Sequence, residues 1–413
     1  MLSPFGKNPS RPTKRGFRIR QLRVPACILV GGLLSALLAG CAPGYFLRAA
    51  YEQGKILWRR EPIADLLERP DVALEKQAKL RLVLEVREYA RDMLNFNVGG
   101  SYASHSFVDR PDLTYIVVAA PKTELRPYTW WFLIIGHVPY KGFFSRAEAE
   151  REIERLRAQD YDTDLRTSAA FSTLGWFDDP LLGHLLGFDK VRLSEIVFHE
   201  LFHNTLYVKG AGAFNESSAN FVGHRAAIDF FRERRGENSA EYQSAIRAWE
   251  EEKEFGRFIA EVVDTLAGLY GRDISRQDKL RLREAVFERS KAEWAKRIAD
   301  RPGHRLRGFS QRPLNNATLM HYVVYLKDLD LFEALYEACE RNLARTVNAL
   351  KEATASGGEP FEAVRQWLSK RPGVPLESAA SLRPITSLPP FLSESGGSLQ
   401  YAPLVRSDRL SSY

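Results

Sequence analysis

The sequence predicts an α+β fold in which a small antiparallel sheet packs against a larger set of helices. Apolar residues recur at helical spacing in residues 42–98 and again from Arg192 to about Glu352. Between these stretches, residues 113–138 are rich in β-branched and aromatic side chains, which favours strands. Helices that lie apart from a run of strands are typical of the α+β class.

The individual elements follow from local patterns. Residues 113–120 and 128–138 are each predicted to form a strand, because Pro and Gly bound both runs. The capping box Ser145-Arg146-Ala147-Glu148 predicts the start of a charged helix. A third strand is predicted over residues 164–176, and Asp178-Asp179-Pro180 is expected to turn the chain out of it.

The charges are distributed unevenly along the chain. Its 413 residues include 59 Lys and Arg against 52 Asp and Glu. Residues 1–40 hold seven basic residues and no acidic one, so the remainder is balanced at 52 of each sign. The basic character therefore belongs to a leader, and no nucleic-acid partner is expected.

This leader ends in an apolar run, residues 25–40, which is short for a membrane-spanning helix but suits a signal peptide. The run closes with Leu38-Ala39-Gly40-Cys41, which resembles the bacterial lipoprotein box, where cleavage exposes a cysteine that receives lipid. The resemblance implies a signal peptide at residues 1–40 and a protein anchored to a membrane through lipid on Cys41. It implies the periplasmic face of the bacterial cell envelope, and Ala42 favours the outer membrane over the inner one. An uncleaved anchor helix is the alternative.

The mature chain is expected to form one domain, residues 41–370, followed by a flexible tail, residues 371–413, that is rich in Ser and Pro. Once Cys27 is removed and Cys41 is acylated, Cys339 is the only free thiol. No disulfide within the chain can then form, which suits a domain large enough to be held by its own core.

The strongest chemical signal is the H-E-x-x-H pattern at residues 199–203. At about 100° per residue, His199 and His203 lie on one face of a helix, so both imidazoles can bind one metal ion. The Glu200 carboxylate falls beside them, where it can reach a water rather than the metal. The alternative is two ordinary histidines with a solvated glutamate between them.

A third ligand is offered soon afterwards. Asn215-Glu216 begins a second helical pattern just after a connection that contains Gly210 and Gly212. A helix pair joined by a short turn returns the chain antiparallel, so Glu216 can face the two histidines. Three protein ligands and one open position are typical of catalytic zinc sites.

The run FHELFHNTLYVKGAGAFNESSANFV resembles the gluzincin metallopeptidases, and more closely the bacterial predicted-aminopeptidase family of exported lipoproteins. YASHSF, TLGWFDDP and PLNNA match as well, so the resemblance covers most of residues 42–355. It implies a zincin-like fold whose helical part carries the HExxH helix. It also implies one Zn²⁺ per chain, a peptide substrate, ligation by His199, His203 and Glu216, and Glu200 as general base.

Two residues after Glu216 are candidates to support the ligands. Asn220 stands where thermolysin-like enzymes place an aspartate that orients the first histidine, and its carbonyl oxygen can accept an imidazole N–H without bringing charge. His224 lies near the same helical face. The gap between His203 and Glu216 is shorter than in thermolysin-like enzymes, so the resemblance does not extend to their fold in detail.

Four other residues are candidates for substrate contact. Tyr207 and Lys209 lie between the two predicted helices and are expected either to stabilise an oxyanion, to bind a substrate carboxylate or to form a structural turn. Asn315 and Asn316 precede a helix, where capping is favoured over substrate contact.

The third predicted strand is a candidate for pairing with an extended peptide, at residues 171–175. An aminopeptidase must also bind the α-ammonium group of its substrate, and Asp178 and Asp179 are candidates; a plain turn with Pro180 is the alternative.

A different class of protein stays open: a non-catalytic envelope lipoprotein, acting as scaffold or binding module, with a structural or degenerate metal site. A closed structural site needs a fourth protein ligand, which His224 could supply. The sequence does not decide between amino- and endopeptidase and gives no oligomeric state.

Overall fold

The computed structural model describes residues 51, 54–107, 114–132, 136–168 and 178–371. The leader, Cys41, residues 171–175 and nearly all of the tail lie outside this part of the chain, so the predictions made for them stay predictions. The main apolar core is built from residues between Ile56 and Leu368. Among the described residues, no helix is both long and apolar enough to cross a membrane.

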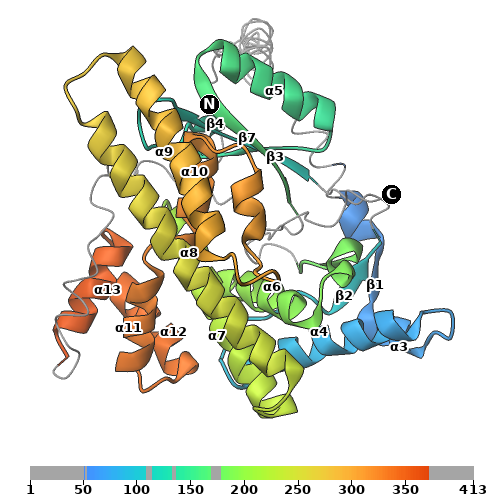
Figure 1. Ribbon diagram of the computed structural model, residues 1–413. Helices are drawn as coiled ribbons and strands as arrows, with labels where there is room; N and C mark the ends of the chain where they lie inside the picture. Colours follow the sequence, from blue (N-terminus) through green and yellow to red (C-terminus); the bar gives the residue numbers. More distant parts are fainter. Residues whose placement is uncertain (1–50, 52–53, 108–113, 133–135, 169–177, 372–413) are drawn as a thin grey trace, which may run out of the picture. The chain divides into compact units, whose positions relative to one another are not determined.

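The predicted α+β class is confirmed, with helices predominating (Figure 1). The helices are α3 (Ile63–Glu68), α4 (Leu74–Asp92), α5 (Arg146–Ala158), α6 (Lys190–His203), α7 (Gly212–Arg235), α8 (Ala240–Tyr270), α9 (Arg276–Arg297), α10 (Asn316–Leu326), α11 (Leu329–Ala338), α12 (Leu343–Thr354) and α13 (Pro360–Ser369), with short 3-10 helices at Gly183–Gly187 and Arg307–Gln311. The strands are β1 (Arg60–Pro62), β2 (Ser104–Ser106), β3 (Thr114–Pro121), β4 (Trp130–Phe132), β5 (Gly136–Val138), β6 (Lys141–Phe143), β7 (Tyr161–Ser168) and β8 (Leu181–Leu182).

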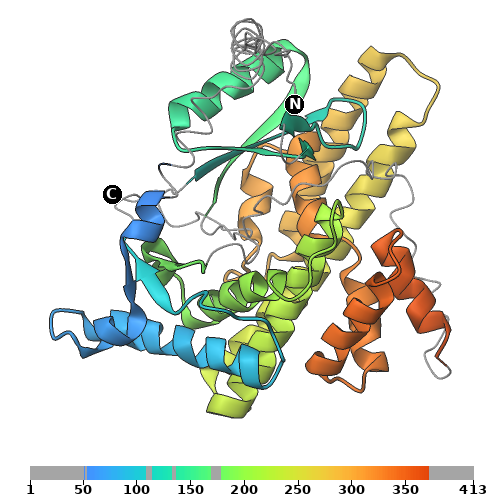
Figure 2. The same cartoon turned by 180° about the vertical axis from the view of Figure 1, so that it is seen from behind.

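The predicted antiparallel sheet is present, with strand order β6-β3-β7. Its side chains alternate between two faces, as the period of a strand requires. Val117 and Ala119 pack with the apolar side of α5, whereas Val118 and Ala120 join the main core on the side of α10. Figures 1 and 2 show α5 over one face of β3 and β7, with the helical part of the molecule on the other side.

The prediction of one strand over residues 128–138 is wrong. This segment forms β4 and β5, which pair antiparallel with Trp130 opposite Val138. Its composition indicates extended backbone correctly, but no Gly, Pro or Asn precedes Gly136 to signal the reversal.

Four other expectations need correction. Residues 42–98 were expected to be helical throughout, but β1 interrupts the described part and joins β2 and β8 in a second sheet, whose strands are too short to show a period. Ser145 is the N-cap of α5, yet its side chain makes no capping hydrogen bond, since its backbone oxygen accepts from Glu148 instead. The third strand begins at Tyr161, and helical structure continues past Glu352 into α13.

Candidate metal centre

Helix α6 carries the H-E-x-x-H pattern into the core. Asp189 caps its N-terminus by accepting a hydrogen bond from the backbone N–H of Arg192 at 2.9 Å. Every residue from Leu193 to His203 is buried, so the helix is covered on all sides. Its polar side chains therefore sit in an environment that requires partners for them.

The connection from α6 to α7 is fixed by Asn215. Its side-chain oxygen accepts from the backbone N–H of Val208 and its amide donates to the Val208 carbonyl, both at 2.8 Å. These two hydrogen bonds hold the loop against the first turn of α7 and so set the position of Glu216. Further along, a Cβ added to Gly223 would lie 2.8 Å from the backbone oxygen of Glu195 and 3.3 Å from Cβ of His199, so only glycine lets the two helices approach this closely.

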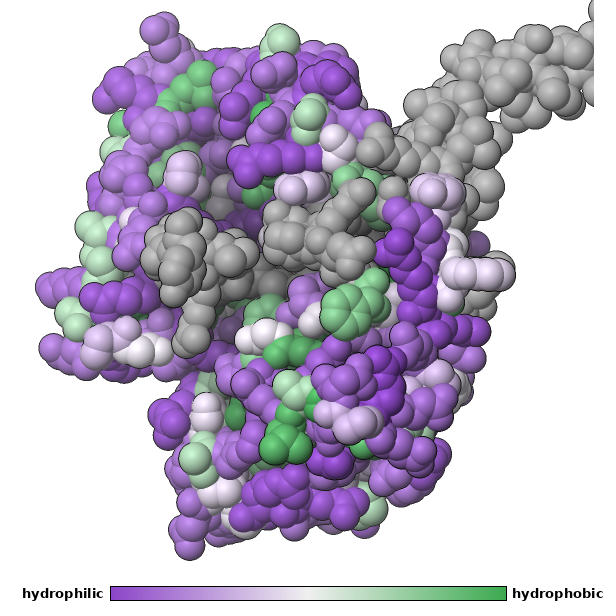
Figure 3. Space-filling view, turned by 90° about the vertical axis from the view of Figure 1, so that its right-hand side faces the viewer, coloured by the Kyte–Doolittle hydropathy of each residue, from purple (hydrophilic) through white to green (hydrophobic). Residues whose placement is uncertain are grey.

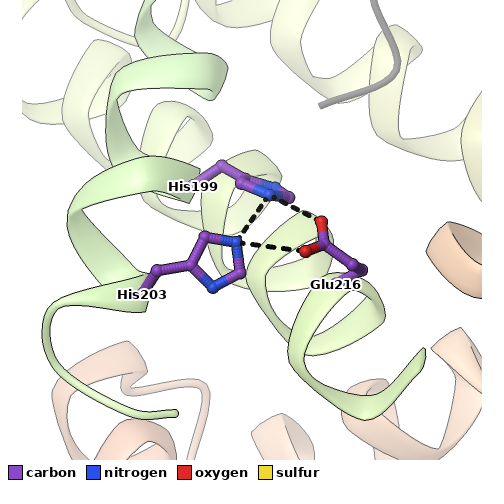
Figure 4. Close-up of side chains that lie close together, drawn as sticks. All are labelled: His199, His203 and Glu216. Atoms are coloured by element: carbon purple, nitrogen blue, oxygen red, sulfur yellow. Dashed lines mark hydrogen bonds and ion pairs between the residues drawn. The ribbon is translucent and has the colours of Figure 1, made fainter. Parts of the chain in front are cut away.

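The two histidines and Glu216 meet in one buried group (Figure 4). The Nε2 atoms of His199 and His203 are 3.1 Å apart, and Glu216 carboxylate oxygens lie 3.3 Å from the first and 3.6 Å from the second. Donor atoms in a tetrahedral zinc site, with metal–nitrogen bonds of about 2.0–2.1 Å, are separated by roughly 3.3 Å. The spacing therefore fits a metal ion, and the group could bind one.

The electrostatics of the group suit a cation. Burial, together with neighbouring His203 and Arg192, holds the pKa of His199 well below its usual value, and burial lowers the pKa of His203 to about 4. Both imidazoles are therefore neutral near pH 7, as metal ligands must be. Burial and the nearby Glu200 raise the pKa of Glu216 well above its usual value, although a hydrogen bond from Tyr325 acts in the opposite direction.

Glu200 lies in the same buried region but outside the ligand group. Neither of its carboxylate oxygens has a hydrogen-bond partner among the described residues. Burial and the charge of Asp179 raise its pKa well above the usual value. A buried carboxyl group of this kind is a common feature of general acid–base sites.

The two aspartates proposed for an α-ammonium group have different surroundings. Asp179 is buried, and its charge acts on both Glu200 and Tyr102. Asp178 is exposed and accepts a hydrogen bond from the backbone N–H of Gly100 at 2.7 Å. A Cβ on Gly100 would meet the Asp178 carboxylate at 2.5 Å, so this side chain packs closely against the loop, and of the two aspartates Asp179 is the one whose charge acts on Glu200.

The candidates Tyr207, Lys209 and Asn220 also differ in their surroundings. Tyr207 is half-buried, and burial and the nearby Glu216 raise its pKa to about 12, so its hydroxyl lies beside the ligand group. Lys209 is exposed. The Asn220 amide donates to the backbone oxygen of Tyr325 at 3.3 Å, and the expected bond from His199 to its side-chain oxygen stays a prediction.

His224 belongs to a second buried cluster. Its Nδ1 lies 3.1 Å from Glu195, which also accepts two hydrogen bonds from Arg305, at 3.1 and 3.0 Å, and one from Arg192 at 3.3 Å. Burial alone would raise the pKa of Glu195, but Arg305 and His224 hold it well below its usual value. Within the described part of the chain, the group with metal-ligand geometry does not include His224, so a closed site with His224 as fourth ligand has no support.

Asn315 and Asn316 hold α10 to the sheet. Asn315 is the N-cap predicted for this helix and accepts from the backbone N–H of Thr318 at 2.9 Å. Asn316 is fully buried, with its amide bonded to the carbonyls of Pro121 and Glu124 and its oxygen accepting from the Tyr270 hydroxyl. Asn315 is therefore a helix cap, as predicted, and Asn316 has a structural role through its buried hydrogen bonds.

Tyr325 at the end of α10 is a site residue that the sequence did not suggest. Its ring centre is 6.5 Å from that of His199, with the planes 28° apart, and its side chain acts to lower the pKa of Glu216. It lies more than 100 residues after both and belongs to no motif, so only the fold brings it to the ligands.

A family model described as "Putative aminopeptidase" matches residues 44–360, which is most of the chain. This range includes the ligand group, Glu200 and Tyr325. No curated protein and no solved structure matches the chain.

Proposed function

Because the chain belongs to that family, we propose that it is a zinc-dependent peptidase of zincin-like fold, and that it acts as an aminopeptidase. The observation that carries the proposal is the buried group of two neutral imidazoles and one carboxylate at tetrahedral spacing, with the carboxyl of Glu200 beside it. His₂Glu is a donor set of catalytic zinc sites. When bound there, zinc supplies Lewis acidity that polarises a peptide carbonyl and acidifies water.

The protein's own groups have separate roles in this proposal. Glu200 accepts a proton from the attacking water and delivers it to the departing amine. Its raised pKa brings the carboxyl closer to neutral pH, where both transfers are feasible. The Tyr207 hydroxyl, whose pKa of about 12 keeps it protonated, donates a hydrogen bond to the developing oxyanion.

Asp179 is the group we assign to the substrate's α-ammonium. Asp179 is buried and its charge acts on Glu200, so an α-ammonium group bound beside it would lie close to the proposed general base. This assignment makes the enzyme an aminopeptidase rather than an endopeptidase. Asp179→Asn would then reduce the rate on peptides with a free N-terminus more than the rate on acetylated ones.

We propose the bacterial cell envelope as the location, with lipid on Cys41 and the outer membrane favoured over the inner one. The support is the sequence of the leader alone, which lies outside the described residues. Replacing Cys41 with serine and following the protein through membrane fractionation tests this proposal, because an uncleaved anchor helix would keep the variant in the membrane.

The function is tested by metal analysis and peptide hydrolysis on the same preparation. The full-length protein, purified in detergent, should contain about one zinc per chain and hydrolyse peptides with a free N-terminus. Loss of activity with a chelator and recovery with zinc are expected. A protein that binds zinc but cleaves no member of a mixed peptide library would instead be a binding lipoprotein.

A further inference from the structure

An apolar pocket of about 40 Å³ lies beside the candidate metal centre. Its walls come from β3, the segment at Pro139 and α10, and it exposes mostly aliphatic and proline side chains. Six of its lining residues are Ile116, Val118, Pro139, Met320, Val324 and Tyr325.

Tyr325 joins this pocket to the ligand group. It lines the pocket, while its ring stacks beside His199 and its side chain lowers the pKa of the neighbouring Glu216. The pocket is therefore one side chain away from the metal ligands. A peptide whose scissile carbonyl reached the metal would place a neighbouring side chain within reach of it.

We propose that this pocket binds the side chain of a substrate residue next to the scissile bond, and that it selects aliphatic side chains of the size of valine, leucine or methionine. The inference rests on the proposed peptidase function and names its substrate class. A cavity of about 40 Å³ suits a short aliphatic chain and is small for tryptophan.

The charges around the pocket argue against basic side chains. His321 is part of the wall, and the charges of Arg166 and Arg312 act on it. Arg166 is itself paired with Asp164 at 2.6 Å and lies over the ring of Tyr322. A lysine or arginine side chain would bring a further positive charge near these groups with no apolar gain, so aliphatic side chains are favoured.

Val324 gives the test, because it lines the pocket and is only partly buried, so that both larger and smaller residues are tolerated. The experiment measures kcat/KM of the full-length zinc-loaded protein for peptides that differ only in the residue before or after the cleaved bond. Wild type should prefer leucine over alanine at one of these positions by about tenfold or more. Val324→Phe should lower kcat/KM for the leucine peptide more than for the alanine peptide, so that the ratio of the two falls toward one, and Val324→Ala should shift the preference toward larger side chains.

A second measurement does not depend on turnover. Metal-free protein should bind a leucine-containing dipeptide more tightly than its alanine analogue, and Val324→Phe should abolish that difference in calorimetric titration. Wild type that cleaves peptides with no preference, or a preference that Val324→Phe leaves intact, would overturn the subsite. Wild type that cleaves nothing but keeps the binding difference would instead overturn the proposed function alone.

A separate surface carries a second inference. Helical residues Tyr51, Lys55 and Trp58 are spaced four and three apart and so share one face, opposite the buried Ile56. Tyr51 is 65% and Trp58 91% exposed. Ser106 of β2 bonds the backbone of Ile56 at 2.9 Å, which brings the next residue, the 61% exposed Phe107, to the same end of the molecule.

Basic side chains accompany these aromatic ones. Lys55 lies over the Tyr51 ring and Lys76 lies 4.3 Å from the centre of the Phe107 ring. Figure 3 shows the side of the molecule that carries β1 and α3, where hydrophobic side chains are exposed among hydrophilic ones. Aromatic rings with lysines beside them are typical of surfaces that contact the headgroup region of a bilayer.

We infer that Tyr51, Trp58 and Phe107, with these lysines, contact the surface of an anionic lipid bilayer. Both interpretations of the leader, lipid on Cys41 or an anchor helix, put a membrane attachment within about ten residues of Tyr51. At about 3.3–3.6 Å per residue, this chain holds Tyr51 no more than roughly 36 Å from the attachment point.

Vesicle flotation tests this contact. Residues 42–413, which retain the whole described core and carry neither leader nor lipid, should float with vesicles of phosphatidylethanolamine and phosphatidylglycerol at low salt. The double variant Trp58→Ser, Phe107→Ser should bind at least about fivefold more weakly. The matched control is Trp131→Ser, which removes a 55% exposed aromatic ring from β4 and should change nothing. No flotation of wild type, or an equal loss in the control, would overturn the inference.

Discussion

Helices α6 and α7 hold two buried clusters of histidine and glutamate, one turn apart on α6, and the two are built in opposite ways. In the first, Glu195 and His224 are joined by Arg305 and Arg192, and these charges hold the Glu195 pKa low. In the second, His199, His203 and Glu216 come together with Glu200 nearby, and burial raises the pKa of both glutamates. The first cluster contains its own arginine cations, whereas the second could bind a metal ion.

This difference supports our proposal that the first cluster is structural and the second is functional. A buried carboxylate costs several kcal/mol unless a charge or hydrogen bonds compensate it. Arg305 and Arg192 supply this compensation at Glu195. At Glu216 and Glu200 the free-energy cost of burying a carboxylate is not compensated in this way. Such a cost is expected only where ligand binding or catalysis makes use of the buried carboxyl group.

The largest expected effect comes from removing the charged ligand. Glu216→Ala takes a carboxylate from the group, so zinc should be lost or bound far more weakly, and activity should vanish with it. Metal analysis after dialysis measures this directly. A variant that retained one zinc per chain would show that the ligands are wrongly assigned.

Glu200→Gln tests whether Glu200 acts as a general base rather than as a metal ligand like Glu216. The three ligands stay in place, so zinc should remain near one per chain, while turnover falls at least about 100-fold because general acid–base help is lost. Parallel zinc and rate measurements on the two variants give a crossed pattern. Loss of metal from Glu200→Gln would mean that Glu200 is itself a ligand.

Glu195→Gln tests the structural cluster. It leaves Arg305 and Arg192 without their charge partner, and unfolding free energy should fall by roughly 2–3 kcal/mol, at the low end for a buried ion pair because both arginines keep some contact with water. Denaturant titration measures this loss. Zinc should still bind to the folded variant. Unchanged stability with loss of zinc would mean that the Glu195 cluster is the functional one and the His199 cluster the structural one.

Gly223→Ala acts on both clusters at once, since the added Cβ would press on the Glu195 carbonyl and on His199. We expect a net loss of roughly 2 kcal/mol in stability, in spite of the better helix propensity of alanine, and weaker zinc binding. Gly268→Ala in α8 is the matched control, because nothing lies within 4 Å of its added Cβ, and it should stabilise the protein by up to about 1 kcal/mol. Equal melting temperatures for the two variants would contradict the close approach of α6 and α7.

The smallest effect concerns His105, a buried histidine outside both clusters. Burial and the charge of Lys76 lower its pKa to about 4, against about 6.5 when unfolded. The unfolded chain therefore binds a proton first as the pH falls below about 6.5, and this residue makes the folded state less stable down to about pH 4. His105→Gln should reduce the stability lost between pH 7 and 5.5 by roughly 1 kcal/mol, measured by denaturant titration at each pH. An unchanged loss would mean that the folded protein leaves His105 as free to titrate as the unfolded chain.

Local spacing explains what the sequence predicted well. His199, Glu200 and His203 lie within one helical turn, and Glu216 follows a short connection, so helix geometry alone brings three donor atoms together. The same helical spacing predicted that Asn220 and His224 lie near the ligands, but it did not show which residues they contact. Those partners, Tyr325 and Glu195, depend on how the helices pack.

Longer-range features gave no signal. Tyr325 and Arg305 reach the two clusters from about 100 residues away, and no motif marks them. The β4–β5 reversal lacks turn residues, and β1, β2 and β8 are too short to show a period. Such features are set by tertiary packing rather than by local preference.

The clamp that Asn215 forms with Val208 has a kinetic consequence. All three donors come from residues 199–216, so the hairpin of α6 and α7 closes a short loop and does not wait for distant strands to pair. An ion held by both helices raises the free energy of opening this hairpin by an amount set by its affinity and concentration. Backbone amides in α6 and the first turns of α7 would then exchange with deuterium more slowly in the metal-loaded protein, while those of α12 and α13 keep their rates.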